Sequence, residues 1–308
     1  RGSSTTPNGL AVAEGVDIDR DGDIYYFYAG DLLGNLWKFD FTATTAAQWK
    51  VAYGTTAAPA PLFSATSSSG VVQPITGGVS VGFNPKDRKL WVFFGTGRYL
   101  STADLSTTAT QTWYGLNDTG STIASRSDLA QRIILQESST GAGDSYRVVS
   151  KPGDSSGGTV MGTKRGWYID LTSPVSGAEG ERIIHPPVLA SSTLFVNSLI
   201  PSSDPCVPGG RGWVMGVNPF TGGRQEFDVF DFNRDGSVDS GDQVNLANGD
   251  GTSRRTVGSG YSTDSLPGSP LQIGKQQVVG GSDGTAHTRI VSDGLRSGRV
   301  SWKEIVRD

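Results

Sequence analysis

The sequence predicts an all-β protein, and among all-β folds it favours a β-propeller. Gly accounts for 43 of the 308 residues, about twice the usual share, and charged residues for only 18%. Glycine adopts positive φ without steric cost, so this content suits many short strands joined by tight turns. Seven Trp, nine Tyr and twelve Phe residues can fill a packed core, which argues against an unfolded chain. Strand–turn units recur along the sequence, as a propeller of four-stranded blades requires.

Two strands near the amino end show this pattern most clearly. Residues Ile24–Ala29 and Leu36–Phe41 are rich in aromatic and other β-favouring side chains. Between them, Gly34 and Asn35 form a typical hairpin turn. The alternation along the second strand predicts that it is half-buried, with two kinds of side chain on opposite faces: Trp37, Phe39 and Phe41 on one, Lys38 and Asp40 on the other.

The chain length sets the expected number of blades, while the repeats themselves show only about five blade-like units. At about 40–45 residues per blade, the chain has room for about seven blades, and we expect one domain over residues 1–308. Residues Arg126–Glu137 alone have a helical periodicity, and a strand is the alternative there. The further units are Leu90–Arg98, Thr112–Leu116, Gly166–Leu171, Gly212–Asn218 and Gln277–Ala286.

Charge and composition exclude several classes of protein. The net charge of −4 argues against a nucleic-acid partner, which needs a clustered basic face. No apolar run approaches the ~20 residues that cross a bilayer. The chain begins Arg-Gly-Ser-Ser, without Met or a signal segment, so we expect a piece of a longer protein. Cys206 is the single cysteine, so it is either free or paired with a cysteine outside this piece.

The main acidic loop, residues 231–242, has the spacing of an EF-hand-like calcium loop. Side-chain oxygens fall at loop positions 1, 3, 5, 9 and 12, and a glycine at position 6 allows the sharp turn. Ser237 at position 7 offers its backbone carbonyl, while the last carboxylate binds through one oxygen or through water. A solvated acidic turn is the alternative. The candidate calcium ligands are Asp231, Asn233, Asp235, Ser237, Asp239 and Asp242.

The second acidic loop, residues 17–23, matches the same pattern only in its first half. Loop positions 9 and 12 are occupied by Tyr25 and Tyr28, so the late carboxylate is missing. Four carboxylates within seven residues repel one another unless a cation or hydrogen bonds offset the repulsion. Calcium binding and a metal-free turn both remain open for its candidate ligands, Asp17, Asp19, Asp21 and Asp23.

Several segments, taken in order, resemble the PilY family of type IV pilus biogenesis proteins. The first, which follows the second acidic loop, reads Tyr-Ala-Gly-Asp-Leu-Leu-Gly-Asn-Leu-Trp-Lys-Phe-Asp, and the last reads Gly-Arg-Val-Ser-Trp-Lys-Glu. The resemblance covers nearly the whole chain. The matching segments are Tyr28–Asp40, Gln73–Thr76, Phe94–Leu100, Gln111–Gly115, Gly180–Arg182 and Gly298–Glu304.

The resemblance implies the carboxy-terminal domain of such a protein, a modified seven-bladed propeller without the amino-terminal adhesive region. It further implies a secreted protein at the pilus tip or outer-membrane surface, which supports pilus assembly, twitching and adhesion. Its partners would be minor pilins or other tip components, together with host or surface receptors. Calcium in the main acidic loop would oppose pilus retraction. The chain has no Arg-Gly-Asp tripeptide, so the integrin binding of some relatives is not carried over.

An enzyme is the rival interpretation, although we expect none. Residues 30–37 and 280–285 also resemble blade repeats of quinoprotein dehydrogenases, but such repeats report fold more than function. Residues 78–82 match the Gly-x-Ser-x-Gly pattern of a nucleophile elbow, yet their flanks read as a strand and a loop. His185 and His287 are the only histidines, and neither has an evident catalytic partner. A dockerin needs two adjacent loops with helices, and here the acidic loops lie far apart.

Overall fold

The computed structural model describes residues 2–139, 145–204, 209–292 and 294. Short strands dominate it, and within these ranges the only helices are short 3₁₀ turns. No helix in the described ranges is long and apolar enough to span a membrane. The four turns are η1 (Ala46–Gln48), η2 (Thr102–Leu105), η3 (Arg126–Asp128) and η4 (Ser240–Asp242).

The strands form four larger sheets and two small hairpins. The first sheet contains β1 (Glu14–Val16), β2 (Tyr26–Gly30), β3 (Asn35–Asp40), β4 (Lys50–Val51) and β7 (Phe63–Ser64). The second has the order β11 (Ala130–Arg132), β14 (Gly166–Asp170), β10 (Thr112–Asp118), β9 (Leu90–Gly95) and β8 (Ser80–Phe83). Pairing is antiparallel in both sheets except between β11 and β14.

The third sheet has the order β12 (Ile134–Ser139), β13 (Ser145–Val149), β20 (Gly260–Thr263), β17 (Gly210–Val217), β16 (Thr193–Pro201) and β15 (Val188–Ala190). The fourth contains β21 (Leu271–Ile273), β22 (Gln276–Gly280) and β23 (Ala286–Ile290). The hairpins are β5 (Tyr53–Gly54) with β6 (Pro59–Ala60), and β18 (Val244–Ala247) with β19 (Ser253–Thr256).

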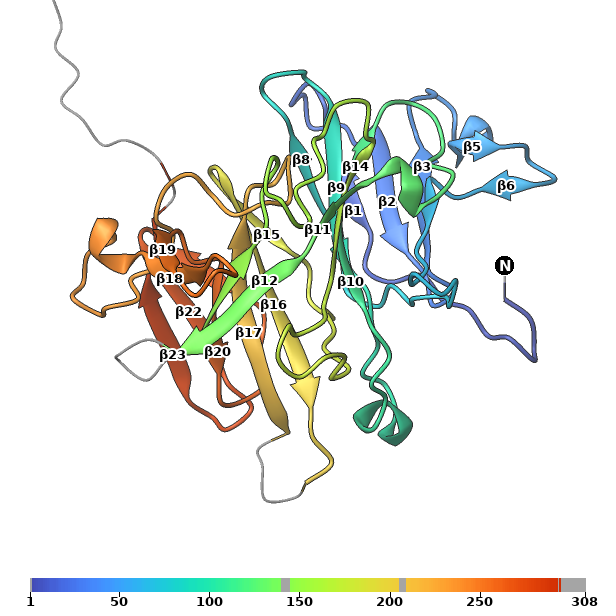
Figure 1. The fold of residues 1–308 in the computed structure, drawn as a ribbon. Coiled ribbons are helices and arrows are strands. Elements are labelled where there is room, and N and C mark those ends of the chain that lie inside the picture. Colours follow the sequence, from blue (N-terminus) through green and yellow to red (C-terminus); the bar gives the residue numbers. More distant parts are fainter. Residues whose placement is uncertain (1, 140–144, 205–208, 293, 295–308) are drawn as a thin grey trace, which may run out of the picture.

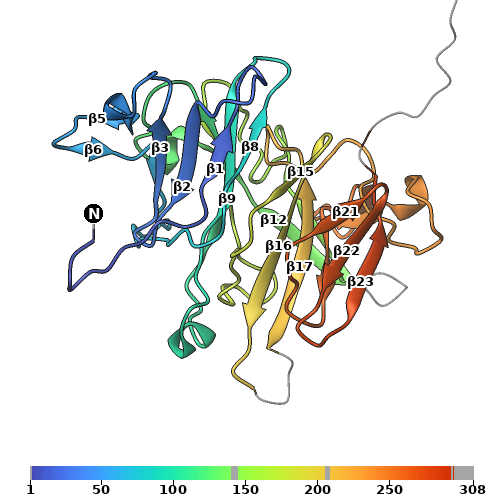
Figure 2. The same ribbon diagram turned by 180° about the vertical axis from the view of Figure 1, so that it is seen from behind.

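The four sheets stand side by side in chain order (Figures 1 and 2). Alternate side chains of one strand enter different cores: Trp91 and Phe93 of β9 pack toward the third sheet, while Val92 and Phe94 pack toward the first. A third core between the last two sheets includes Phe195, whose neighbours on β16 belong to the preceding core. The inner sheets are therefore apolar on both faces, as propeller blades are.

The predicted strands are confirmed, and the structure also decides between helix and strand for residues Arg126–Glu137. Residues Arg126–Glu137 are not an α-helix, because they form η3, β11 and part of β12. The described residues give four sheets of three or more strands, so the number of seven blades stays a prediction. The predictions for Cys206 and for Gly298–Glu304 lie outside the described residues.

The side chains of β3 alternate as predicted, but the more deeply buried face is the one that carries Lys38. Leu36 and Lys38 are buried, whereas Trp37 and Phe39 are only partly covered. The predicted alternation is therefore confirmed, and the structure adds that the face with Leu36 and Lys38 is the more deeply buried one. The lysine tolerates burial because its ammonium group pairs with Asp118 of the second sheet at 2.8 Å.

The same turn joins the strands in the first and fourth sheets. Gly34 has φ +77° and donates its N–H to the carbonyl of Asp31, and Gly284 has φ +82° and donates in the same way to Gly281. Positive φ at this position favours glycine. The pattern that residues 30–37 and 280–285 share with quinoprotein dehydrogenases is therefore explained by a tight turn between two strands of one sheet.

The segment Gly180–Arg182 links the second and third sheets. The guanidinium group of Arg182 donates to the carbonyl oxygens of Arg98, Asp104 and Thr107 at 2.7–2.9 Å. It therefore holds the loop that carries η2. The neighbouring Glu181 points into the core, where it meets a buried arginine.

Candidate functional site

The main acidic loop begins with a tight turn organised by Asp231. One carboxylate oxygen of this buried residue accepts the N–H of Asp235 at 3.2 Å, and the other accepts the N–H of Gly236 at 2.9 Å. Arg234 and Gly236 have φ +60° and +87°, so the chain reverses sharply at loop positions 4 and 6. The predicted need for a glycine at position 6 is met by this geometry.

Asp242 closes the other end of the loop. It is 2% exposed, and one of its oxygens accepts the N–H groups of Phe232 and Asn233 at 2.7 and 3.1 Å. The second oxygen accepts the N–H of Asp239, whose own carboxylate accepts that of Gly241. Positions 1 and 12 are therefore bound to backbone amides, and ionised carboxylates keep further lone pairs for a cation.

The exposed part of this loop carries the remaining candidates. The carboxylate of Asp235 accepts the Ser237 N–H at 2.8 Å and the side-chain amide of Asn233 at 3.0 Å. The side-chain carbonyl of Asn233 in turn accepts the N–H of Asp235 at 2.9 Å. Within the described ranges, no three carboxylates of this loop come as close together as those of the second loop.

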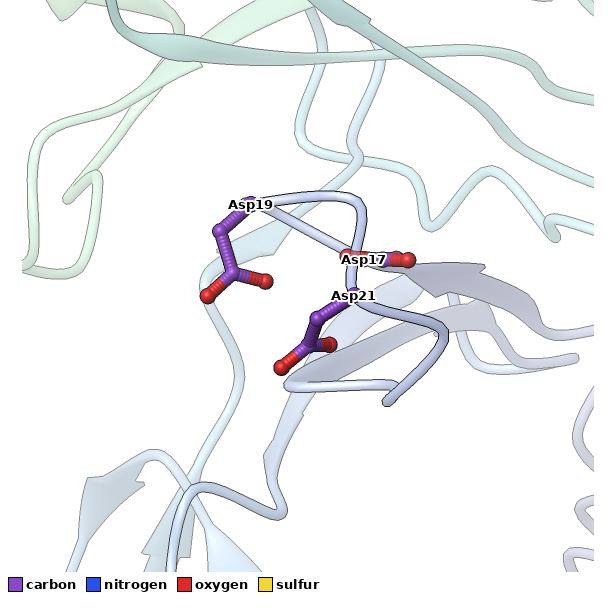
Figure 3. Close-up of side chains that lie close together, drawn as sticks. All are labelled: Asp17, Asp19 and Asp21. Carbon is purple, nitrogen blue, oxygen red and sulfur yellow. The ribbon is translucent and has the colours of Figure 1, made fainter.

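The second acidic loop brings three carboxylates together. Asp17, Asp19 and Asp21 each place an oxygen within 4.8 Å of the others, and Figure 3 shows Asp19 and Asp21 on the same side of the loop. The oxygens of Asp17 accept the N–H groups of Arg20 at 2.6 Å and Gly22 at 2.9 Å, which have φ +65° and +100°. The turn thus repeats that of residues 231–236.

Tyr25 is a member of this cluster that the sequence pattern did not reveal. Its hydroxyl donates to Asp19 at 3.0 Å and to Asp21 at 3.3 Å, so a phenol stands where the pattern lacks its late carboxylate. Asp23 contributes its backbone N–H to Asp21, at 2.9 Å, and its carboxylate is not part of the cluster. The hydrogen bond to Asp19 is the main cause that raises the pKa of Tyr25 to about 12.

Asp19→Asn is expected to lower the pKa of Tyr25 from about 12 toward the ordinary value of about 10, because an uncharged acceptor no longer opposes the phenolate. Calcium bound by the loop is expected to act in the same direction. The measurement is a titration of tyrosinate absorbance, taken as the difference between the wild type and Tyr25→Phe. An unchanged pKa in Asp19→Asn would contradict the proposed contact.

Asp228 is a second residue that the pattern missed, since it lies three positions before the main loop. Its Oδ1 is buried and has no hydrogen-bond partner within the described residues. Burial raises the pKa of this carboxyl, and the nearby charges of Asp242 and Asp239 raise it further, against a hydrogen bond from Gln243. An unsatisfied acceptor beside two acidic groups is an arrangement that a cation would stabilise.

Both loops fit calcium by the chemistry of their donors. Every candidate side chain offers a hard oxygen, and no nitrogen or sulfur ligand stands among them. The close carboxylates of residues 17–21 and the unsatisfied oxygen of Asp228 support the same conclusion. When bound, calcium would neutralise these charges and order the loops.

An arginine of the β18–β19 hairpin holds the carboxy-terminal end of the main acidic loop. Arg255 of β19 donates to the carbonyls of Ser240, Gly241 and Gln243 at 2.8–3.1 Å. Its side chain therefore clamps η4 against the β18–β19 hairpin.

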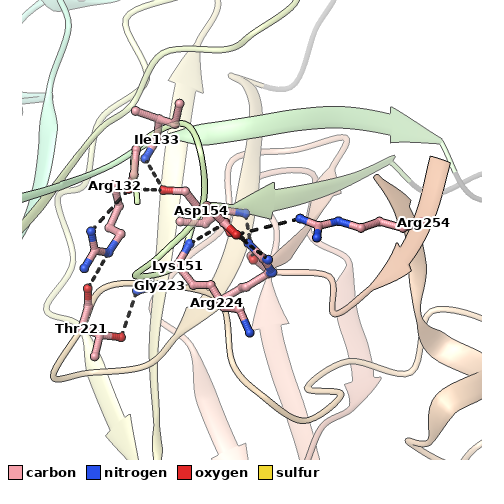
Figure 4. Close-up of polar contacts among 12 residues, drawn as sticks. Arg132, Ile133, Lys151, Asp154, Thr221, Gly223, Arg224 and Arg254 are labelled. Carbon is pink, nitrogen blue, oxygen red and sulfur yellow. Dashed lines mark hydrogen bonds and ion pairs between the residues drawn. The ribbon is translucent and has the colours of Figure 1, made fainter. Parts of the chain in front are cut away.

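The hairpin is in turn tied to the core. Arg254 lies 3.9 Å from the Asp154 carboxylate, which also pairs with the buried Arg224 and accepts the N–H of Lys151 (Figure 4). The hairpin thus contacts this network through one long ion pair of a partly exposed arginine.

Two residues of the weaker catalytic alternatives, Ser80 and His287, lie in different sheets, the second and the fourth. Ser80 lies within β8, so the strand–turn–helix of a nucleophile elbow is absent there. Burial lowers the pKa of His185. His287 has partners that the sequence did not reveal, the hydroxyls of Ser265 at 3.2 Å and Thr285 at 3.3 Å.

Comparison with known proteins identifies the family. A family model described as the PilY1 beta-propeller domain matches residues 1–140. A type IV pilus biogenesis factor PilY1 homolog of Xylella fastidiosa is 39% identical over 308 residues, which cover 99% of this chain and 23% of that protein. The type IV pilus biogenesis factor PilY1 of Pseudomonas aeruginosa PAO1 is 35% identical over 270 residues, 78% of this chain and 23% of that protein.

The fold agrees with this similarity. The crystal structure of the Pseudomonas aeruginosa PilY1 C-terminal domain matches with a TM-score of 0.77 and 28% identity, and the match covers 96% of this chain and 63% of that one. The chain spans about a quarter of the length of these curated relatives. By sequence and by fold, the chain belongs to the PilY family and carries the β-propeller fold of its carboxy-terminal domain.

Proposed function

We propose that this chain is a calcium-binding propeller module of a type IV pilus biogenesis factor on the outer surface of the cell. The observation that carries the calcium part is the convergence of Asp17, Asp19 and Asp21 on a turn that the main acidic loop repeats. The pilus part is supported by the similarity to proteins named as type IV pilus biogenesis factors. No enzymatic activity is part of the proposal.

Calcium would act on the two acidic loops by neutralising their carboxylates and by fixing their conformation. Without a cation, the carboxylates of residues 17–21 repel one another, and an extracellular calcium site of this kind binds at about 10⁻⁴–10⁻³ M. Binding would fix the loop carboxylates in one arrangement. In the main loop, Arg255 and the β18–β19 hairpin would carry that ordering toward Asp154 and the third sheet.

The biological consequence we propose is calcium-dependent control of the pilus. An ordered loop would present a docking face to minor pilins or other tip components, favour extension over retraction, and so support twitching and adhesion to surface receptors. The absence of an Arg-Gly-Asp tripeptide leaves integrin binding out of the proposal.

The test uses the full-length protein in the bacterium that encodes it. With calcium in the medium, cells carrying Asp21→Ala together with Asp235→Ala are expected to hold less surface pilin than wild-type cells, because neither loop can be ordered. A chelator is expected to remove the difference. The matched control is Asp250→Ala, an exposed aspartate whose carboxylate caps a turn at Thr252 outside both loops.

Immunoblotting of the full-length protein separates lost function from lost protein. An equal response of surface pilin to calcium in the wild type and the double variant would overturn the proposed control.

A further inference from the structure

A cleft of about 850 Å³ with both polar and apolar lining residues opens at the outer edge of the first sheet, away from both acidic loops. It lies among the ends of β3 and β4, the turn η1 and the β5–β6 hairpin, which projects from the sheet in both views (Figures 1 and 2). This volume falls within the ~300–1,000 Å³ of small-molecule sites. The lining residues that matter here are Asp40, Thr42, Gln48, Trp49, Lys50 and Thr56.

Trp49 gives the cleft an exposed aromatic wall. The side chain is 48% exposed, although its indole N–H donates to the carbonyl of Ala43 at 3.0 Å. Its ring also meets Phe41 edge-on, with 4.6 Å between the centroids and 75° between the planes. The indole is therefore held in one orientation while much of its surface faces water, so its exposed face can stack on a ligand without rearrangement.

The polar groups beside the indole include both donors and acceptors. One oxygen of Asp40 accepts the N–H of Thr42 at 3.0 Å and its hydroxyl at 2.7 Å, which orients the carboxylate. The side chains of Gln48, Lys50 and Thr56 make no hydrogen bond or ion pair within the described ranges. They are thus available to a ligand.

We propose that this cleft binds a neutral saccharide. Each sugar hydroxyl both donates and accepts, so it needs the mixture of carboxylate, amide, ammonium and hydroxyl groups found here. The C–H face of a pyranose ring is apolar with slightly positive hydrogens, and it stacks on the negative face of an indole.

The charge and polarity of the cleft exclude other classes of ligand. One carboxylate and one ammonium group offset each other, which disfavours a strongly charged ligand, and a wholly apolar ligand would leave the hydrogen-bonding groups of Asp40, Gln48 and Lys50 without partners. The proposal is independent of calcium and of the pilus role, and it concerns residues outside both acidic loops.

The test is a calorimetric titration of the 308-residue chain with maltotriose, cellotriose and the trimer of N-acetylglucosamine, each with calcium and with chelator. At least one is expected to bind with a Kd on the order of 1 mM. Trp49→Ala is expected to raise that Kd at least about tenfold, which corresponds to about 1.4 kcal/mol. Trp49→Phe keeps an aromatic face and should have a smaller effect.

Gln48→Ala combined with Thr56→Val leaves the indole in place and removes two hydrogen-bonding groups, so weakened binding in this variant supports the site even if Trp49→Ala disturbs the turn. Val175→Ala, exposed elsewhere on the surface, is the control and should bind as the wild type does. Absence of saturable binding to all three sugars, or an unchanged Kd in both cleft variants, would overturn the proposal.

Discussion

Glu181→Ala is expected to lower the free energy of unfolding by about 3–5 kcal/mol, because it leaves a buried guanidinium group without its main counter-charge. Arg147 is 0% exposed and meets Glu181 through two parallel hydrogen bonds of 2.6 Å each. Glu137, at 2.8 Å, is the second carboxylate on this arginine, and the Trp213 ring lies 4.0 Å away on one face. Chemical denaturation followed by tryptophan fluorescence measures the change.

The matched control is Glu179→Ala, two residues earlier in the same segment. Its carboxylate pairs with Arg211 at 2.6 Å, but both side chains are partly exposed, so the expected loss is below about 1 kcal/mol. Similar losses for the two variants would show that the Arg147 cluster does not stabilise the fold as described.

Asp118→Ala is expected to cost about as much, roughly 3–5 kcal/mol, because its carboxylate at the end of β10 binds groups of the first sheet, of the β5–β6 hairpin and of its own loop. One of its oxygens accepts Lys38 Nζ at 2.8 Å and the Tyr28 hydroxyl at 2.6 Å, and the other accepts the Tyr53 hydroxyl at 2.7 Å and the Gly120 N–H at 2.9 Å. Without it, the Lys38 ammonium group has no ion-pair partner among the described residues and keeps only ring contacts, with centroids of Tyr26, Tyr28 and Tyr53 at 3.8, 5.6 and 6.0 Å.

The buried pair of Lys38 and Asp118 predicts that the free energy of unfolding depends on pH. Burial acts to raise the pKa of Asp118, but hydrogen bonds from Lys38 and Tyr28 outweigh it and hold that pKa below its usual value. The stabilisation is therefore present above the ordinary aspartate pKa and is lost as the pH falls through the lowered one. Unfolding measured across acidic pH should show this loss in the wild type, and Asp118→Asn should reduce it. The control is Glu226→Ala, which removes the exposed ion pair with Lys151. It should leave the dependence of unfolding on pH nearly unchanged.

The strands could be predicted because their signals are local. Alternating and continuous apolar runs, punctuated by glycine turns such as Gly34, predicted strands that match β2, β3, β9, β10, β14, β17 and β22. The buried face of β3 could not be predicted, because the partner that makes a buried Lys38 tolerable lies 80 residues away on β10. A contact between distant sheets leaves no trace in the alternation of one strand.

The acidic loops illustrate the same limit. Spacing alone predicted the turns at Gly22 and Gly236, since the pattern follows from local backbone geometry. The closer grouping of carboxylates in the second loop was not predicted. The sequence pattern shows that this loop lacks its late carboxylate, but it does not show that the Tyr25 hydroxyl binds Asp19. Asp228 was missed because it precedes the loop and approaches it only in the folded chain.

The most direct test of the proposed calcium function is a calorimetric titration of the chelator-treated chain with calcium. We expect saturable binding at two sites with Kd of about 10⁻⁴–10⁻³ M, of which Asp21→Ala removes one and Asp235→Ala the other, while Asp250→Ala removes neither. Absence of saturable binding in the wild type, or an unchanged number of sites in both loop variants, would contradict it.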